Sequence, residues 1–214
     1  LDRADDDRYA AWLGAGFGAE PPVAAQSRVL SRSANLFQAG LLASRSRHPE
    51  GLAKILGQYF AMPVRVERYV AHWLDFEAAD QTRLGYARNR GERATVEARA
   101  LGVSATAGHK VRDRQSMFRV RFGPLTFAQY EQLLPPGRAW RSTLEWIRQY
   151  VGWGLRFDIQ LVLAAEQVPP PRLGNKLRLG LTTWIGHHRD AHDRADLRLR
   201  PDSSFLLRSG AVHA

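Results

Sequence analysis

The sequence contains no cysteine, and lysine stands only at positions 54, 110 and 176. Without thiols the chain forms no disulfide, no thiolate zinc site and no cysteine nucleophile. A reducing, cytoplasmic setting is compatible with this. No apolar run approaches the ~18 residues of a membrane-spanning helix, so we expect no membrane span. These absences exclude disulfide scaffolds and zinc ribbons, and they argue against a helical membrane protein.

The residues that are present describe a folded protein. Hydrophobic residues make up 44% of 214 positions and include six Trp, six Tyr and nine Phe, which is enough to build a core. The chain begins at Leu1 without a methionine. We therefore expect it to be a fragment of a longer protein.

The chain has a formal net charge of +10, which bears on the kind of partner that it binds. The arginines are dispersed, which favours a solvated, partly partner-facing surface, but a basic nucleic-acid-binding module stays as the alternative. Arg119 and Arg121 alternate with Phe118 and Phe122, so aromatic and basic side chains lie on opposite faces of a strand. If these aromatic residues are in the core, they cannot stack on bases.

Periodicity and capping signals predict helices alternating with strands, an α+β fold. Gly123 and Pro124 are expected to end the strand at 118–122, and Thr126 with Gln129 forms a capping-box pattern. A phase shift predicts a β-bulge near Glu67 or Arg68. The expected helices lie near 5–17, from 31 or 33 to 42, at 49–60, from 126 to 134 and at 140–151; the expected strands lie at 64–73, 118–122, 155–164 and 197–200; and a long loop covers 75–112.

Comparison of the two halves indicates an internal repeat. A helix at 49–60 leads into a strand at 64–73, as 140–151 leads into 155–164. Matching Arg-Leu-Gly triplets, Leu-Gly segments, a histidine, an Asp-Arg pair and an alternating strand then follow in the same order. We predict two similar helix-strand units, each with a long extended loop that returns as a β-strand. The expected divisions are 1–48 (an N-terminal helical segment), 49–125, 126–200 and a tail at 201–214.

Several of these stretches resemble the C-terminal two thirds of TssG, the type VI secretion baseplate subunit also called ImpH or VasB. The resemblance covers residues 1–186, and the motifs occur in matching order: EGLAKILGQYFAMPVRVE at 50–67, DRQSMFRVRFGPL at 113–125, DIQLVL at 158–163 and RLGLTTWIG at 178–186. It implies a structural, non-enzymatic subunit of an obligate hetero-complex, with the family's N-terminal third missing here. TssG joins two TssF copies in a baseplate wedge and is held by TssK trimers through two extended loops.

The two loops supply the candidate site residues. Apolar residues near the loop glycines are expected to bind partners, and the glycines with Pro124 are expected to set the geometry. The partner-binding candidates are Leu84, Leu101, Val103, Leu173, Leu179, Leu181, Trp184 and Ile185; the structural candidates are Gly85, Gly102, Gly108, Gly123, Pro124, Gly174, Gly180 and Gly186. The resemblance places the assembled protein at the cytoplasmic face of the inner membrane.

One cluster has the chemistry of metal ligands: His187, His188, Asp190, His192 and Asp193. His188 and His192 are four residues apart, as on one helix face, but the segment is predicted to be a loop. A polar loop tip is the favoured interpretation. The glycines lack the spacing of a phosphate-binding loop, and no acid-base or nucleophile constellation can be assembled. We therefore expect no catalytic residue, no metal, no cofactor and no nucleic acid.

Overall fold

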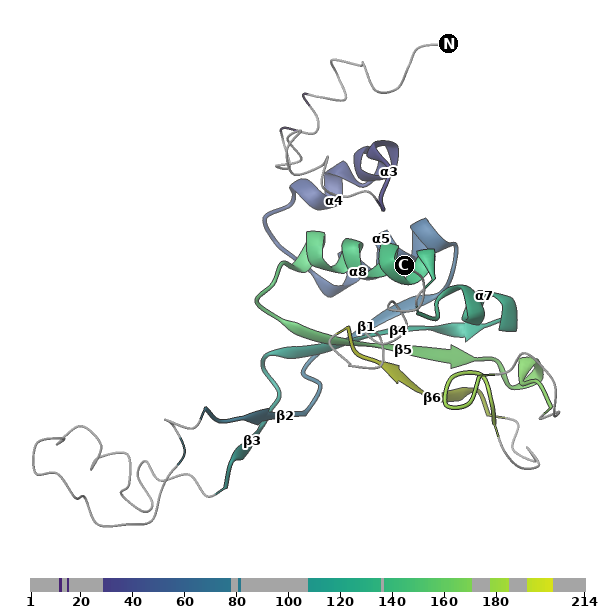
Figure 1. Cartoon of the computed structure of the whole chain (residues 1–214). Helices are drawn as coiled ribbons and strands as arrows, with labels where there is room; N and C mark the ends of the chain where they lie inside the picture. The colour runs from purple at the N-terminus through teal and green to yellow at the C-terminus, as the bar shows by residue number, and fades with distance from the viewer. Residues whose placement is uncertain are drawn as a thin grey trace, which may run out of the picture. The chain divides into compact units, whose positions relative to one another are not determined.

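The computed structural model of the chain describes residues 12, 15, 29–77, 81, 108–135, 137–170, 178–184 and 192–201 (Figure 1). The chain forms two compact units, a larger one of residues 1–68 with 118–214 and a smaller one of residues 69–117. Helices and strands are mixed, which confirms the predicted α+β class. The divisions expected at residues 48, 125 and 200 stay a prediction about the organisation of the repeat.

The first described helices of the larger unit whose bounds are defined are α3 (Arg32–Phe37), α4 (Ala39–Ala43) and α5 (Pro49–Phe60). The prediction of one helix up to residue 42 is wrong, because the chain leaves helical geometry at Gln38. That side chain is buried, and its Nε2 donates to Gln58 Oε1 at 3.0 Å. The prediction of α5 is confirmed, with Pro49 in the first turn and Ala61 in a left-handed conformation at the end. The helix expected near 5–17 lies mostly outside the described residues.

Four strands form the sheet of the larger unit, in the order β1-β4-β5-β6. Their bounds are β1 (Val64–Glu67), β4 (Met117–Leu125), β5 (Arg156–Leu163) and β6 (Arg194–Leu199). β1 pairs with β4 antiparallel, and so does β5 with β6. Each half of the predicted repeat therefore pairs its own first strand with its own last strand. β6 begins before residue 197, where the sequence predicted it, and a short 3-10 helix (Ala165–Gln167) follows β5.

The two halves meet between β4 and β5, which run parallel. The Phe118 ring stacks on that of Phe157, and Ala164 N donates to Leu125 O at 3.0 Å. The two residues of each contact are the same number of positions apart in the sequence, which is the pattern of parallel neighbours. Parallel neighbours need a crossover connection, and α7 (Phe127–Gln132) with α8 (Arg138–Val151) provides it. β4 and β5 therefore run in one direction, and β1 and β6, at the two edges of the sheet, run in the other.

The capping box predicted at the start of α7 is confirmed. Gln129 N donates to Thr126 Oγ1, and Thr126 N donates to Gln129 Oε1 at 3.0 Å. α8 begins two residues earlier than predicted, at Arg138, and Gly152 ends it with a left-handed φ of +83°. The link from β4 to α7 and the link from α8 to β5 are both short, so both helices lie over the same sheet.

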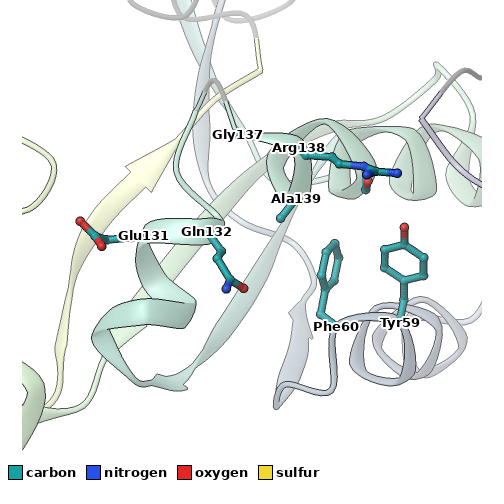
Figure 2. A pocket seen from close by; sticks show the side chains of 8 residues that line it. Tyr59, Phe60, Glu131, Gln132, Gly137, Arg138 and Ala139 are labelled. Atoms are coloured by element: carbon teal, nitrogen blue, oxygen red, sulfur yellow. The ribbon is translucent and has the colours of Figure 1, made fainter.

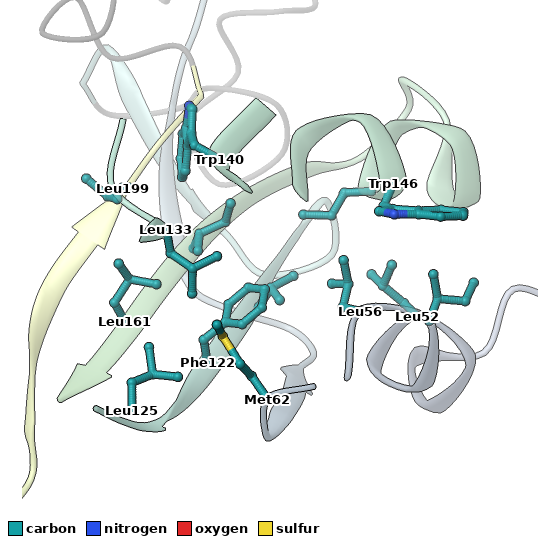
Figure 3. Close-up of a cluster of buried hydrophobic side chains, with 14 of the residues drawn as sticks. Leu52, Leu56, Met62, Phe122, Leu125, Leu133, Trp140, Trp146, Leu161 and Leu199 are labelled. Atoms are coloured by element: carbon teal, nitrogen blue, oxygen red, sulfur yellow. The ribbon is translucent and has the colours of Figure 1, made fainter. Parts of the chain in front are cut away.

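The hydrophobic core lies between the helices and one face of the sheet (Figure 3). Trp146 of α8, Tyr130 of α7 and Phe122 of β4 are its largest fully buried side chains. The ring of Tyr59 lies edge-on to Trp146 with centroids 5.5 Å apart, which joins α5 to α8. Apolar burial of this kind is the main stabilising contribution to the fold.

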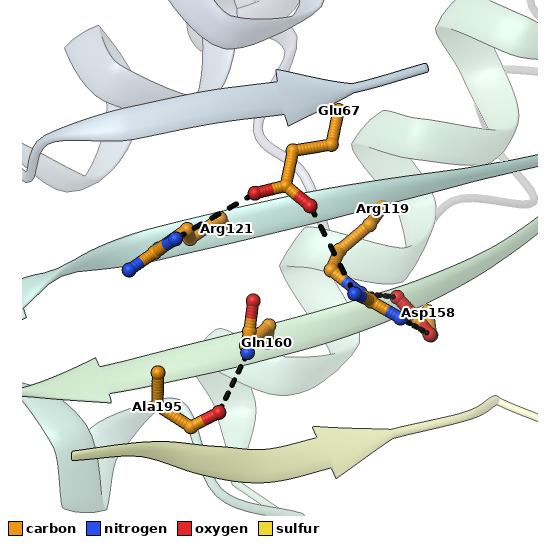
Figure 4. A network of polar contacts seen from close by, with 6 residues as sticks. All are labelled: Glu67, Arg119, Arg121, Asp158, Gln160 and Ala195. Carbon is orange, nitrogen blue, oxygen red and sulfur yellow. Dashed lines mark hydrogen bonds and ion pairs between the residues drawn. The ribbon is translucent and has the colours of Figure 1, made fainter. Parts of the chain in front are cut away.

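The opposite face of the sheet is polar and partly buried, a feature that the sequence did not predict. On this face of β5, Asp158 is only 1% exposed and Gln160 is buried as well. The Arg119 guanidinium pairs with Asp158 through Nε–Oδ1 at 2.7 Å and Nη2–Oδ2 at 2.8 Å (Figure 4). Hydrogen bonding to Asp158 raises the pKa of Arg119 above its usual value. Pairing makes burial of both charges tolerable.

Gly123 and Pro124 do not end β4, contrary to prediction. The Gly123–Pro124 peptide is cis, and the strand continues to Leu125 because Gly123 N donates to Pro63 O at 2.9 Å and the next strand binds Leu125 O. Gly123 has φ +127°, and a Cβ there would lie 2.7 Å from Val162 Cβ. Glycine is therefore required at this position by both conformation and space.

The smaller unit contains a two-stranded antiparallel ribbon of β2 (His72–Asp75) and β3 (Lys110–Asp113). The prediction of one bulged strand at 64–73 is wrong, because β1 and β2 belong to different sheets. Tyr69 takes a left-handed φ of +57°, and Val70 N donates to Met117 O at 3.0 Å. The apolar phase shift in the sequence was therefore a strand break and not a bulge.

Candidate protein-protein interface

The ribbon of β2 and β3 is the described base of the first predicted loop. Its register places Trp73 opposite Arg112 and Asp75 opposite Lys110, whose Nζ lies 3.1 Å from the Asp75 carboxylate. Phe76 N then donates to His109 O at 2.9 Å, and Gly108 has φ +92°. The strands thus bring the two ends of the segment between 77 and 108 together.

Exposed aromatic rings mark this ribbon as an interaction surface. Trp73 is 63% exposed and Tyr69 is 66% exposed. Side chains alternate along a strand, so Trp73 and Arg112 share a face of the ribbon opposite to His72 and Leu74. An isolated two-stranded hairpin is marginally stable in water, and large exposed aromatics are typical anchors of protein interfaces. The sequence did not single out Trp73, because the residue was expected to lie at the end of one continuous strand at 64–73.

The other face of the ribbon is held by a polar cluster. Asp113 accepts hydrogen bonds from the Ser116 hydroxyl and from the backbone N–H groups of Gln115 and Ser116, both at 3.0 Å. These bonds, the Ser116 hydroxyl first, lower the pKa of Asp113 to about 2. His72 is buried, with Nε2 at 3.5 Å from Ser116 Oγ and 3.9 Å from Asp113 Oδ2. Because Asp113 and not the histidine binds the hydroxyl closely, the cluster closes a turn and does not activate a nucleophile.

The base of the second predicted loop docks on α7. The Tyr130 hydroxyl donates to Leu181 O at 3.0 Å, and burial raises the pKa of Tyr130 above its usual value. The Trp184 ring lies 5.9 Å from that of Tyr130, and Leu181 is buried in the core. Gly180 has φ +79°, which gives the turn at 178–182 its left-handed position.

Within this turn the predicted partner-binding residues divide into two groups. Leu179 is 80% exposed, which makes its side chain available to a partner. Leu181 and Trp184 instead fix the turn to the fold. Their remaining counterparts lie outside the described residues: Leu84, Leu101, Val103, Leu173 and Ile185, with the glycines Gly85, Gly102, Gly174 and Gly186.

A surface pocket of about 450 Å³ lies between the end of α5, the end of α7 and the first turns of α8 (Figure 2). Tyr59, Phe60 and Ala139 form its apolar wall, and Glu131 and Arg138 contribute the charged groups. Ser142 also lines it but is buried, and neither a histidine nor a second carboxylate lines it with Glu131. The pocket suits an apolar side chain of a partner better than a chemical reaction.

The candidate metal cluster is only partly described. His187, His188 and Asp190 lie outside the described residues, whereas His192 and Asp193 are exposed. The Asp193 carboxylate accepts a hydrogen bond from Ala165 N at 3.1 Å, which is a structural task. Within the described ranges, no three acidic or histidine side chains gather closely enough to hold a metal ion.

The aromatic residues beside the strand arginines are in the core. Phe118 and Phe122 are both buried, so neither can stack on a base. Among the helices in the described ranges, none is long and apolar enough to cross a membrane.

The fold of the chain is similar to that of solved structures. The chain is similar over 98% of its length to 86% of a chain in a cryo-electron microscopy structure of the type VI secretion system TssK-TssF-TssG baseplate subcomplex, with a TM-score of 0.69 and 17% identity. It is also similar over 93% of its length to 54% of a chain in a structure of the baseplate complex of that system, with a TM-score of 0.64 and 16% identity. No curated protein sequence matches. The model of the family "Type VI secretion, TssG" matches residues 1–186, and the chain therefore belongs to the TssG family.

Proposed function

We propose that this chain is a structural subunit of the type VI secretion baseplate that assembles with TssF and TssK. In this proposal it bridges TssF copies in the wedge and holds TssK trimers through two extended loops, at about 80–112 and 168–190. Family membership and the likeness to a chain of a TssK-TssF-TssG subcomplex support the assignment to the baseplate. We place the assembly at the cytoplasmic face of the inner membrane, as the family resemblance implies.

The observation that carries the loop assignment is the strand pairing. β1 and β4 are antiparallel partners separated by residues 68–116, and β5 and β6 are antiparallel partners separated by residues 164–193. Each intervening segment therefore leaves the sheet and returns to it at a fixed place, as a loop that grips a partner requires. The exposed side chains at their bases, Trp73 and Leu179, are the first contacts that we assign to partners.

Deletion of each loop tests the proposal. We would co-express the chain with TssF and TssK and replace residues 78–107, residues 171–177 or both by a short Gly-Ser linker. Each single deletion should reduce the TssK that co-purifies, and the double deletion should abolish it while TssF is retained. Undiminished TssK after the double deletion would refute the loop assignment.

Point variants separate recognition from folding. W73A and L179A remove exposed side chains, so the unfolding midpoint should hold while TssK binding weakens by roughly ten-fold, as for a typical interface anchor. F37A is the matched control, because Phe37 is 76% exposed on α3 and belongs to neither loop segment. Equal losses for F37A and W73A would contradict a specific role of the ribbon.

A further inference from the structure

The polar face of the sheet, defined by Arg119, Arg121, Asp158 and Gln160, carries its charges in rows that cross the strands. Register places Glu67 beside Arg119 and Arg65 beside Arg121. The parallel offset set by the Arg119–Asp158 contact places Arg121 beside Gln160, and Gln160 pairs with Arg198 on β6. Two neighbouring rows result: a mixed row of Glu67, Arg119 and Asp158, and an arginine row of Arg65, Arg121, Gln160 and Arg198.

The mixed row is neutralised within the fold. Arg119 contacts Asp158 at 2.7 Å and lies 3.8 Å from Glu67, so one guanidinium serves two carboxylates (Figure 4). Asp158 and Arg119 keep only 2% and 12% of their side-chain surface exposed. This row is therefore an internal network that holds β1, β4 and β5 in register.

The arginine row is neutralised only in part. Glu67 lies 3.6 Å from Arg121 and 3.8 Å from Arg119, so one carboxylate is shared by two guanidinium groups. Arg65 and Arg198 are exposed, and no carboxylate in the described part of the chain lies within ion-pair distance of either. Gln160 Nε2 donates to Ala195 O at 2.6 Å, and the neutral amide adds no negative charge to the row.

The row is also unfavourable by itself. Arg65 and Arg121 are direct cross-strand neighbours, and like charges in that position repel. Three strand spacings separate β1 from β6, so the row extends over about 14 Å. It presents guanidinium groups at both ends with a neutral centre. Incoming carboxylates would relieve the repulsion and form forked hydrogen bonds with each guanidinium.

We propose that the arginine row is a docking site for an acidic segment of a partner protein, with carboxylates that meet Arg65 and Arg121 at one end and Arg198 at the other. A second copy of this chain is a poor occupant, because two chains that each carry a formal net charge of +10 repel each other. A nucleic-acid strand is disfavoured because Phe118 and Phe122, the aromatic residues of β4, are buried and cannot stack on bases. The inference rests on the proposed function in one respect, namely that the chain works inside a hetero-complex.

Zero-length cross-linking tests the contact directly. Carbodiimide joins an amine to a carboxylate but leaves guanidinium groups unreacted, and the chain has lysine only at positions 54, 110 and 176. In the complex with TssF and TssK, R65K and R198K should each yield a new isopeptide bond to an aspartate or glutamate of a partner, identified by mass spectrometry. R141K, on an exposed position of α8, is the control and should yield none.

Charge reversal gives an independent readout. R65E/R198E should weaken assembly by about ten-fold or more at low salt, because like charges would then face each other, and the loss should shrink at high salt. R45E/R141E changes the net charge equally at exposed positions outside the row and should bind like the parent. Equal effects of both pairs, or no cross-links from R65K and R198K, would overturn the inference.

Two further outcomes have separate meanings. If no complex with TssF and TssK forms even for the unaltered chain, the proposed function fails and not merely the docking site. If a labelled 20-nucleotide single strand binds the unaltered chain and R65E/R198E abolishes this binding, the row serves nucleic acid and the inference is wrong. If the complex forms and only the row variants weaken it, the acidic partner segment is supported.

Discussion

Removal of the Asp158 carboxylate should be among the most damaging single changes in the larger unit. Asp158 is 1% exposed and accepts two hydrogen bonds from the Arg119 guanidinium, at 2.7 and 2.8 Å. D158A would leave a mostly buried cation with only Glu67 nearby, at 3.8 Å. An uncompensated buried charge costs several kcal/mol in folding free energy.

The magnitude follows from what remains after the change. Loss of one partner of a buried pair typically costs about 3–5 kcal/mol, and the remaining contact with Glu67 places D158A near the lower end, at about 3 kcal/mol. R119M removes the cation and leaves Asp158 buried without its guanidinium, so we expect about 4 kcal/mol. Replacement of both by apolar residues, R119M/D158L, should recover most of the loss, because no charge is then buried.

Urea unfolding followed by tryptophan fluorescence measures these differences. With a slope of roughly 2 kcal/mol per molar urea, D158A should lower the midpoint by about 1.5 M. R121M, at a half-exposed position of the same strand, is the control and should shift the midpoint by less than about 0.5 M. A D158A loss below about 1 kcal/mol, or a double variant no more stable than D158A, would refute the reasoning.

Three more outcomes are expected. G123A should destabilise the larger unit by at least about 2 kcal/mol, because Gly123 has a left-handed φ and a Cβ there would overlap Val162 of the next strand. G40A, in an open helical position, should stabilise the unit by about 0.5–1 kcal/mol. The urea midpoint should therefore fall for G123A and rise for G40A. Y130F should cost about 1–2 kcal/mol and speed proteolysis after the turn at 178–182, because Leu181 O loses its buried donor; an unchanged cleavage rate would argue against docking of that turn. The turn closed by Asp113 should persist on mild acidification. The folded-state pKa of Asp113 is lowered, so its contribution to stability is complete above the ordinary pKa of 3.8 and is lost as the pH falls through about 2. The amide resonances of Gln115 and Ser116 should titrate near that pH, and D113N should remove the titration.

The sequence by itself determined local features of the fold, such as where helices begin. Pro49 and the apolar spacing after it set α5, and Thr126 with Gln129 set the start of α7, because a proline ring and a capping box act within one helical turn. The repeated order of motifs also indicated that each half contains a helix, a strand and a returning strand. The family resemblance rested on the same motifs, and the family model matches the same residues.

Only the tertiary structure decided which strands share a sheet and which polar residues are buried. The break at Tyr69 and the continuation of β4 through Gly123 and Pro124 depend on partners far along the chain, Met117 and Pro63, and a local pattern does not contain them. Asp158 of β5 can be buried because Arg119 of the neighbouring strand β4 pairs with its carboxylate. Tertiary contacts likewise distinguish Leu179, which is exposed, from Leu181, two residues later, which is buried. Periodicity reports only which side chains share a face, whereas burial is a property of what the completed fold places against that face.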